Sequence, residues 1–184
     1  KLKKRVVIIG GGAAGVFSAI QLRERLDCDV TIYEKTSELL KKVKISGGGR
    51  CNVTHHYLSQ AQFSKNYPRG QKILKQNFNK FSAADMRMWL ETRGVKLKTE
   101  ADGRVFPISN DSQTIIDCFL RELDRFNIKV VFGSELQKIA KRDHEFILTI
   151  NRKECSADYA IIATGGAQKE RELDMFTSIG IQII

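Results

Sequence analysis

A glycine-rich turn between a short apolar run and an amphipathic segment constrains the fold more than any other feature. The run at residues 5–9 is β-branched and ends at Gly10-Gly11-Gly12-Ala13-Ala14-Gly15, which fits the pattern Gly-x-Gly-x-x-Gly. Apolar residues then recur at helical spacing over residues 13–20. A second short strand over residues 29–33 closes with Glu34. This order predicts a right-handed β-α-β unit with parallel strands, the seed of a doubly wound sheet.

The residue types in this turn suit a dinucleotide. Gly10 permits the tight turn, Gly12 lets the backbone approach a pyrophosphate, and Gly15 lets helix and strand pack closely. The helix start, with Ala13 and Ala14, offers free N–H groups and a positive dipole end to an anion.

The acidic residue at the end of the second strand completes the fingerprint. Glu34 lies 19 positions after Gly15, against about 20 expected. We expect it to accept two hydrogen bonds from the adenosine ribose and to repel a 2′-phosphate, which favours FAD or NAD over NADP. Its neighbour Lys35 is included among the candidate cofactor-binding residues. The alternative is a glycine turn followed by an incidental Glu.

The remaining pattern alternates strands and helices. Residues 57–94 are irregularly helical, with a capping box at Ser82–Asp85 and a core face of Met86, Trp89 and Leu90. Residues 96–107 look extended around an Asp-Gly turn, and a helix around residues 116–123 leads into a strand at 128–132. The fold class is therefore α/β: a Rossmann-like doubly wound parallel sheet with a small antiparallel β-meander and a helical excursion. We expect one domain over 1–184, with the excursion at 46–107 and the meander at 134–153.

The far end of the chain bears on the choice between FAD and NAD. Residues 159–163 form an apolar run typical of a buried parallel strand, and Ala163-Thr164-Gly165 follows at its end. This string resembles the Ala-Thr-Gly motif of the two-dinucleotide-binding-domain flavoproteins, whose strand returns beside the first β-α-β unit after a meander. The resemblance implies FAD. By the same resemblance, backbone groups of residues 134–137 would meet the adenine, with Leu136 as the expected position.

The most specific string runs from Lys42 to Thr54. Its core, Ser46-Gly47-Gly48-Gly49-Arg50-Cys51-Asn52, is similar to the signature of the aminoacetone-oxidase-like and bile-acid-reductase-like NAD(P)/FAD-dependent oxidoreductases. Residues 102–107 resemble a second block of that family. His55 departs from the signature, which usually has Asn there. The resemblance implies cofactor contacts from Lys42, Gly49, Arg50, Cys51 and Asn52.

Cys51 invites a redox interpretation. Disulfide reductases carry a second Cys five residues on, but His56 stands there, which excludes a dithiol relay. A lone thiol of low pKa beside Arg50, a thiol packed against the flavin, and an inert core thiol remain open. The four cysteines and three histidines form no metal-ligand pattern, so no metal is expected.

The composition argues against a membrane-spanning, secreted or disulfide-bonded protein. No apolar run approaches the ~20 residues that cross a bilayer, no signal peptide is visible, and the cysteines are widely spaced, so we expect a cytoplasmic protein with reduced thiols. The net charge of +10 comes from bases that look spread along the chain, apart from runs at 1–5 and 41–44. A solvated face accounts for most of them.

By resemblance, the whole protein passes a hydride from NAD(P)H or from a small-molecule substrate through FAD. One rival is a flavoprotein acting on tRNA, against which no aromatic residues interleave with the two basic runs, so a nucleic-acid partner is not expected. Another is an NAD-binding module without catalysis. Because family members are longer, we also expect this chain to be a fragment, completed by the rest of its own chain or by self-association.

Overall fold

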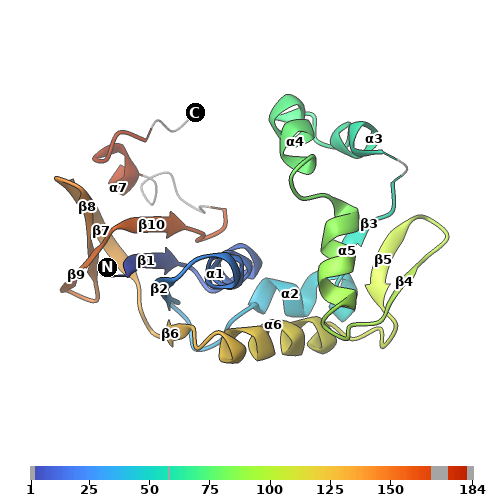
Figure 1. The fold of residues 1–184 in the computed structure, drawn as a ribbon, viewed down its shortest axis with the longest axis horizontal. Coiled ribbons are helices and arrows are strands. Elements are labelled where there is room, and N and C mark those ends of the chain that lie inside the picture. The colour runs from blue at the N-terminus through green and yellow to red at the C-terminus, as the bar shows by residue number, and fades with distance from the viewer. Residues whose placement is uncertain (1–2, 58, 167–173, 182–184) are drawn as a thin grey trace. The chain divides into compact units, whose positions relative to one another are not determined.

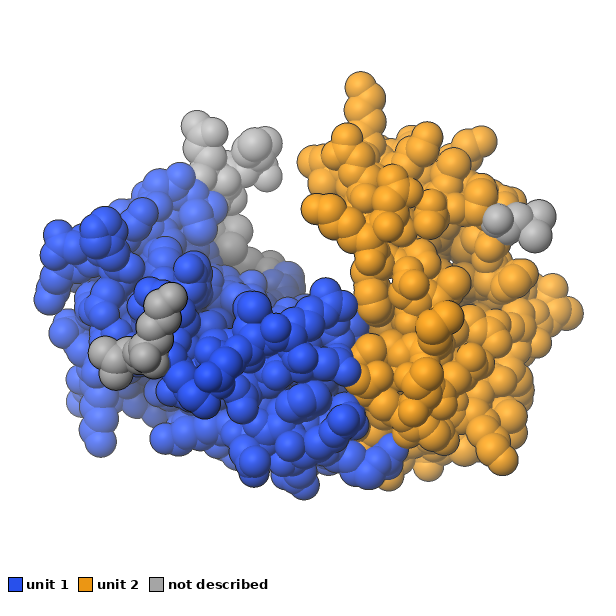
Figure 2. All heavy atoms as spheres, viewed as in Figure 1, with its two compact units in different colours: residues 1–42, 119–184 blue, residues 43–118 orange. Residues whose placement is uncertain are grey.

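A computed structural model of the protein describes residues 3–57, 59–166 and 174–181 (Figure 1). The chain divides into two compact units (Figure 2). Unit 1 comprises residues 1–42 and 119–184, and unit 2 comprises residues 43–118. The expected excursion at 46–107 falls within unit 2.

Unit 1 is built on a parallel sheet with strand order β10-β1-β2-β6. Its strands are β1 (Lys4–Ile9), β2 (Cys28–Tyr33), β6 (Lys129–Val131) and β10 (Tyr159–Ile162). Ile8 of β1 lies opposite Ile32 and Ile161 in the neighbouring strands, and Ile8 and Ile32 are fully buried. The predicted Rossmann-like parallel sheet is therefore confirmed, including the return of the late strand beside the first.

The two faces of β1 are covered by different elements of unit 1. Val7 and Ile9 pack with the antiparallel sheet of β7 (Leu136–Arg142), β8 (Glu145–Ile150) and β9 (Lys153–Ala157), and with α7 (Asp174–Thr177). Because side chains alternate along a strand, Ile8 faces the other way, toward α1 (Ala13–Arg25). Figure 1 shows α1 and the antiparallel sheet lying beside the parallel strands. Each fully buried aliphatic side chain here contributes about 1.5–3 kcal/mol.

Unit 2 combines short helices with a small antiparallel sheet of order β3-β5-β4. Its elements are a 3-10 turn at Ser46–Gly49, β3 (Thr54–His55), α3 (Gln60–Ser64), α4 (Gln71–Phe78), α5 (Ala83–Glu91), β4 (Leu97–Thr99) and β5 (Arg104–Pro107). The predicted capping box at the start of α5 is present, and Trp89 and Leu90 are buried as expected. Two helices cross the boundary between the units: α2 (Lys41–Ile45) and α6 (Gln113–Arg125).

Two local details were not expected from the sequence. Ser46–Gly49 closes one 3-10 turn, in which Gly47 and Gly48 have a φ of 56° and 67°. The meander extends past residue 153 through Ala157, because Ala157 is fully buried and continues the inward alternation of β9. The sequence of residues 181–184 is strand-like, and residues 182–184 lie outside the described residues.

Candidate functional site

The turn between β1 and α1 is fixed by close backbone approach at two glycines. Gly10 has a φ of 109°, and a Cβ there would lie 2.3 Å from the carbonyl oxygen of Ala163. A Cβ at Gly15 would lie 1.9 Å from the carbonyl oxygen of Gly10. Both separations are far inside van der Waals contact, so neither position accepts a side chain without movement of the backbone.

Gly12 differs from the other two fingerprint glycines because nothing lies within 4 Å of a Cβ built on it. It is the N-cap of α1, and no side chain caps the helix there. The first helical hydrogen bond runs from the N–H of Val16 to the Gly12 carbonyl, which leaves the N–H groups before Val16 outside the helical ladder. Ala13 and Ala14 are exposed at this end. The turn therefore presents an open face with the donors an anion requires.

Glu34 lies at the end of β2 and its carboxylate is anchored on both oxygens. Oε2 accepts a hydrogen bond of 2.7 Å from the N–H of Gly11. Oε1 accepts from the N–H of Thr36 at 2.8 Å and from its hydroxyl at 2.7 Å. Burial alone would raise the pKa of Glu34, but the hydrogen bonds from Gly11 and Thr36 outweigh burial, and the pKa lies below its ordinary value. The carboxylate is therefore a fixed anion at neutral pH.

Sequence reasoning did not include Gly11 or Thr36 in the site. A Cβ at Gly11 would lie 2.2 Å from the Leu39 side chain and 3.1 Å from Oε2 of Glu34, so the second glycine of the cluster leaves room for both side chains at the turn. Thr36 could have been identified from the sequence, because a Thr two residues after an acidic residue at a strand end can hydrogen-bond to that acidic side chain.

The carboxyl end of β10 meets the same turn. The N–H of Ala163 donates to the carbonyl of Ile9 at 2.8 Å, and Thr164 and Gly165 follow on the surface. A Cβ at Gly165 would lie 3.4 Å from Nζ of Lys42, so unit 1 brings these two predicted residues together. Lys35 is exposed, beside Glu34.

The main chain that leads into Leu136 reaches this region. Its side chain is 8% exposed and belongs to the core beneath β1. The preceding loop binds the segment after β2, since the N–H of Ser134 donates to the Glu34 carbonyl at 2.9 Å. The main chain approaching Leu136 therefore lies next to Glu34, while its side chain is occupied elsewhere.

The predicted residues of unit 2 gather in one loop. Arg50 donates to Oε1 of Glu100 at 2.6 Å and stacks on the Phe106 ring at 4.0 Å, so its guanidinium is held by its own unit. In the amide orientation that satisfies its hydrogen bonds, Asn52 donates to the carbonyls of Thr54 (2.9 Å) and Val105 (3.3 Å). Gly49, with a φ of 84°, has nothing within 4 Å of a built Cβ. This loop is braced internally and is open at Gly49.

Cys51 is buried, with a left-handed φ of 57°. Burial raises the pKa of its thiol, and a hydrogen bond with Ser46 offsets this only in part. The environment therefore favours a neutral thiol over the low-pKa thiol that one interpretation of the sequence requires.

Other site classes find no support in the described part of the chain. Its His, Cys, Asp and Glu residues form no group of three or more with metal-binding geometry. None of its helices combines the length and apolarity needed to span a bilayer.

Comparisons with known proteins agree with this architecture. The family model described as the HI0933-like protein Rossmann domain matches residues 4–171. A 3-dehydro-bile acid delta(4,6)-reductase of Clostridium scindens is 27% identical over 164 residues, which cover 88% of this chain and 39% of that protein. A ribosomal RNA dihydrouridine synthase of Escherichia coli is 28% identical over 160 residues, covering 87% of this chain and 39% of that protein. The chain thus spans about two fifths of the length of these relatives.

Solved structures share the fold at low identity. A 3-ketosteroid-delta4-(5alpha)-dehydrogenase of Rhodococcus jostii superposes with a TM-score of 0.67 at 14% identity, covering 95% of this chain and 49% of that one. CtdE, solved with FAD and a substrate, gives a TM-score of 0.52 at 16% identity, covering 89% and 38% of the two chains. The resemblance that the sequence motifs indicated is confirmed by the family match. The chain belongs to the HI0933-like protein family and carries its Rossmann domain.

Proposed function

We propose that this chain binds FAD and holds its adenosine diphosphate half at the turn between β1 and α1. One observation carries the proposal: the fixed carboxylate of Glu34 and the open face at Gly12 belong to the same glycine turn. The open face would take the pyrophosphate at the start of α1, and Glu34 would take the ribose. The negative charge of Glu34 disfavours a 2′-phosphate, which argues against NADP in this position.

FAD is favoured over NAD by the elements after β6. The antiparallel sheet and the return of β10 beside β1 accompany a flavin in the resembled flavoproteins, and CtdE is one structural neighbour that was solved in complex with FAD. The further residues assigned to cofactor binding are those around the turn and in the unit 2 loop: Gly10, Ala13, Ala14, Gly15, Lys35, Lys42, Leu136, Ala163, Thr164, Gly165, Gly49, Arg50, Cys51 and Asn52.

The activity that follows is that of an oxidoreductase. Bound FAD would accept and return a hydride, with NAD(P)H as the expected donor and a small molecule as the expected acceptor. The residues of this chain would bind and orient the cofactor: α1 neutralises the pyrophosphate, Glu34 fixes the ribose, and Gly10 and Gly15 hold the turn rigid. We assign no catalytic residue: Cys51 is the one candidate that the sequence offers, and the raised pKa of its thiol argues against it.

The direct test is identification of the cofactor. The protein that carries this chain, at its natural length, is purified without added flavin, its visible spectrum is recorded, and the released cofactor is identified by chromatography. FAD in stoichiometric amount supports the proposal. Colourless protein that does not take up added FAD, but binds NAD, would establish the non-catalytic module instead.

A second candidate function is flavin-dependent reduction of a base in RNA. Relatives from Escherichia coli and Haemophilus influenzae, 28% and 26% identical, are named ribosomal RNA dihydrouridine synthase. The excess of +10 charges would favour a polyanionic substrate. Reduction of the bound flavin by NAD(P)H, followed by reoxidation with RNA rather than with a ketone or enone, would favour this candidate.

A further inference from the structure

The positive charge of the chain is concentrated in one stretch. Residues 39–84 contain nine Lys and Arg and no Asp or Glu, so they account for nine of the ten net charges. The density of bases in this stretch is close to that of the whole chain, as expected, so its net charge comes from the absence of acids. Five of the nine lie close together in unit 2, around α3 and α4: Lys65, Arg69, Lys72, Lys75 and Lys80.

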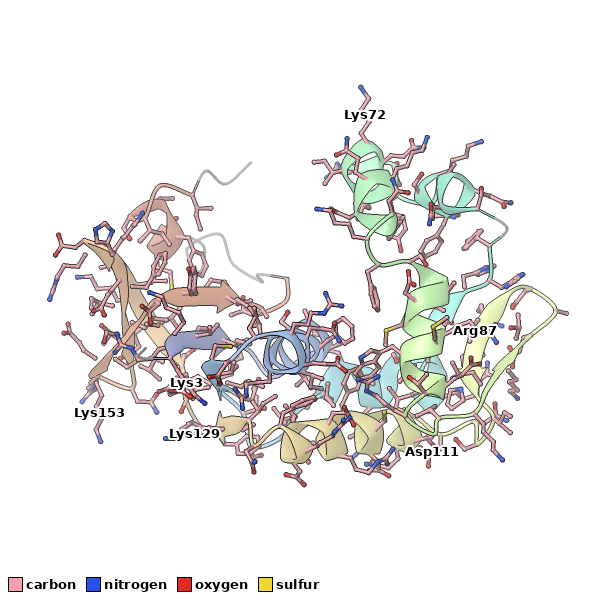
Figure 3. The ribbon with its side chains drawn as sticks, in the orientation of Figure 1. Lys3, Lys72, Arg87, Asp111, Lys129 and Lys153 are labelled. Carbon is pink, nitrogen blue, oxygen red and sulfur yellow. The ribbon has the colours of Figure 1, made fainter. Side chains whose placement is uncertain are left out.

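These five bases lack the ion-pair partners that several arginines of unit 2 have. Arg50, Arg87 and Arg104 each form an ion pair with a carboxylate. Among the described residues, no ion pair involves the five bases around α3 and α4, and all five are exposed. Lys72 points away from α4 into solvent (Figure 3). Exposed bases without ion-pair partners attract polyanions rather than stabilising the fold.

Aromatic rings interleave with these bases, unlike the basic runs noted in the sequence. The Phe63 ring lies between three others, with centroid distances of 4.7 Å to Tyr57, 4.9 Å to Phe78 and 5.7 Å to Tyr67. Tyr67 is 39% exposed. At 100° per residue, Lys75 lies about 60° and Lys72 about 120° from Phe78 around α4, so the bases flank the aromatic face.

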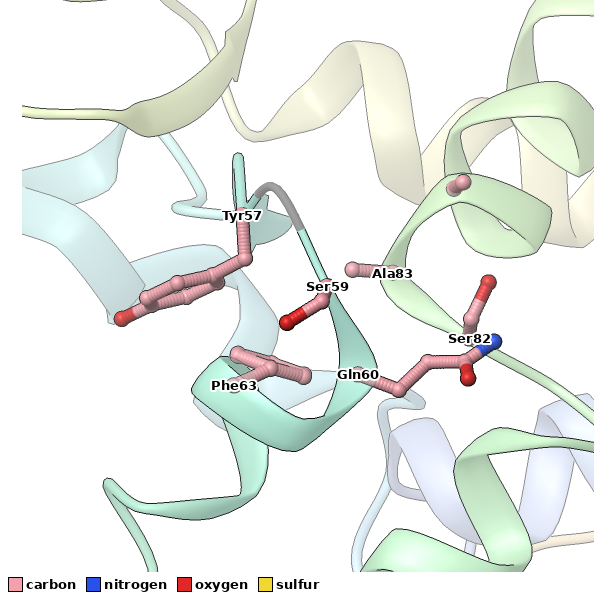
Figure 4. Close-up of a pocket in the computed structure, with 7 residues that line it drawn as sticks. Tyr57, Ser59, Gln60, Phe63, Ser82 and Ala83 are labelled. Atoms are coloured by element: carbon pink, nitrogen blue, oxygen red, sulfur yellow. The ribbon is translucent and has the colours of Figure 1, made fainter.

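A pocket opens beside the cluster, entirely within unit 2 (Figure 4). Its wall includes the Tyr57 and Phe63 rings and the polar side chains of Ser59, Gln60 and Ser82. Ser59 and Ser82 cap α3 and α5. The Gln60 amide makes no hydrogen bond to a described residue. Both of its N–H donors and its carbonyl acceptor are therefore available to the polar edge of a ligand.

We propose that the surface formed by Tyr57 and residues 59–84 of unit 2 binds single-stranded RNA. The five bases would contact phosphates, and an unpaired base would enter the pocket, stack on Tyr57 or Phe63, and meet the Gln60 amide with its edge. Aromatic stacking with hydrogen bonding to base edges is how proteins recognise unpaired RNA. An anionic membrane is the weaker fit, because α4 spans only eight residues and the pocket wall is partly polar. The inference deepens the second candidate function.

The test measures binding of a fluorescent single-stranded RNA to the natural-length protein as a function of salt. Wild type is compared with Lys72→Gln/Lys75→Gln and with the control Lys138→Gln/Lys141→Gln, whose lysines are exposed on β7 of unit 1. Loss of two phosphate contacts should reduce the slope of log K against log salt by about 1.4, since each contact contributes about 0.7. The control should keep the wild-type slope. Gln60→Ala should weaken binding about fivefold or more at an unchanged slope.

Equal slope changes in both double variants would overturn the inference, because RNA binding would then depend on the net charge of the protein and not on the bases around α4. Binding to phosphatidylglycerol vesicles that depends on Lys72 and Lys75, without RNA binding, would replace RNA with a membrane. Wild-type affinity in Gln60→Ala would remove the base pocket. Flavin content is measured on the same samples: yellow protein without RNA binding contradicts this inference alone, whereas RNA binding by colourless protein contradicts the proposed FAD site.

Discussion

The backbone N–H of Gly11 donates a hydrogen bond of 2.7 Å to Oε2 of Glu34, which ties the glycine turn to the end of β2. A carboxylate offers about four lone-pair positions. Thr36 occupies two on Oε1 and Gly11 occupies one on Oε2. One lone-pair position of the carboxylate therefore stays open, and it can accept one hydrogen bond from a ribose hydroxyl without loss of an existing contact. The sequence predicted two hydrogen bonds to the ribose.

Replacement of Glu34 by Gln should weaken FAD binding. The amide presents a donor where Gly11 or Thr36 already donates, so the side chain must lose a contact or turn away from the ribose. A lost hydrogen bond to a charged acceptor costs about 1.5–3 kcal/mol, or roughly ten- to 150-fold in Kd. Titration followed by flavin fluorescence measures it. Glu38→Gln is the matched control, because the Glu38 side chain is exposed and Glu38 meets Thr36 only through its backbone. Identical affinities of the two variants would leave Glu34 with a structural role only.

The same carboxylate should make stability depend on acid pH. The folded-state pKa of Glu34 lies below its ordinary value, so ionised Glu34 stabilises the fold above the unfolded-state pKa, and this contribution is lost as pH falls through the folded-state pKa. The Tm difference between wild type and Glu34→Gln should therefore be largest near neutral pH and shrink in acid. A difference that stays constant down to the acid limit of folding would show that charge plays no part.

The three fingerprint glycines should separate fold from ligand binding. Gly10→Ala and Gly15→Ala place a methyl group 2.3 Å and 1.9 Å from backbone oxygens, which should destabilise the domain by several kcal/mol despite the better helix propensity of Ala. Gly12→Ala meets nothing within 4 Å, and its φ of −79° suits any residue, so it should cost at most about 1 kcal/mol of stability, as a weaker N-cap. Its FAD affinity should nevertheless fall, because the methyl group occupies the face open to the pyrophosphate.

Denaturant unfolding and FAD titration of the three variants check this separation. A stable Gly15→Ala protein, or a Gly12→Ala protein with unchanged FAD affinity, would contradict the assignment of roles.

The local part of the fold was predictable because its signals lie within one turn of each other. The glycine spacing, the helical periodicity after Gly15 and the capping box at Ser82 each specify backbone geometry by neighbouring residues. The contact of Glu34 with Gly11 joins residues 23 positions apart and depends on the register of β1 against β2, which periodicity does not define.

The unit 2 loop shows a different limit. Arg50 was assigned to the cofactor from a motif, yet its partners in this unit are Glu100 and Phe106, some 50 residues away. Sequence spacing carries no information about such a pair. The stretch at 39–84 without Asp or Glu is present in the sequence. Apart from the run at 41–44, its bases are separated from one another, so it does not stand out as a run of adjacent bases.

Cys51 should be dispensable for electron transfer. Its thiol is buried, burial raises its pKa, and no second cysteine stands at the spacing of a redox pair, so little thiolate is present at neutral pH. Cys51→Ala should retain flavin and its rate of reduction by NAD(P)H, measured by anaerobic bleaching, to within about twofold, because an uncharged buried thiol contributes packing and not chemistry. In the native protein, a thiol reagent should label Cys155, which is partly exposed, before Cys51, and denaturant should abolish the difference. Early labelling of Cys51, with loss of flavin reduction in a Cys51→Ala protein that still holds its flavin, would instead identify Cys51 as a catalytic thiol.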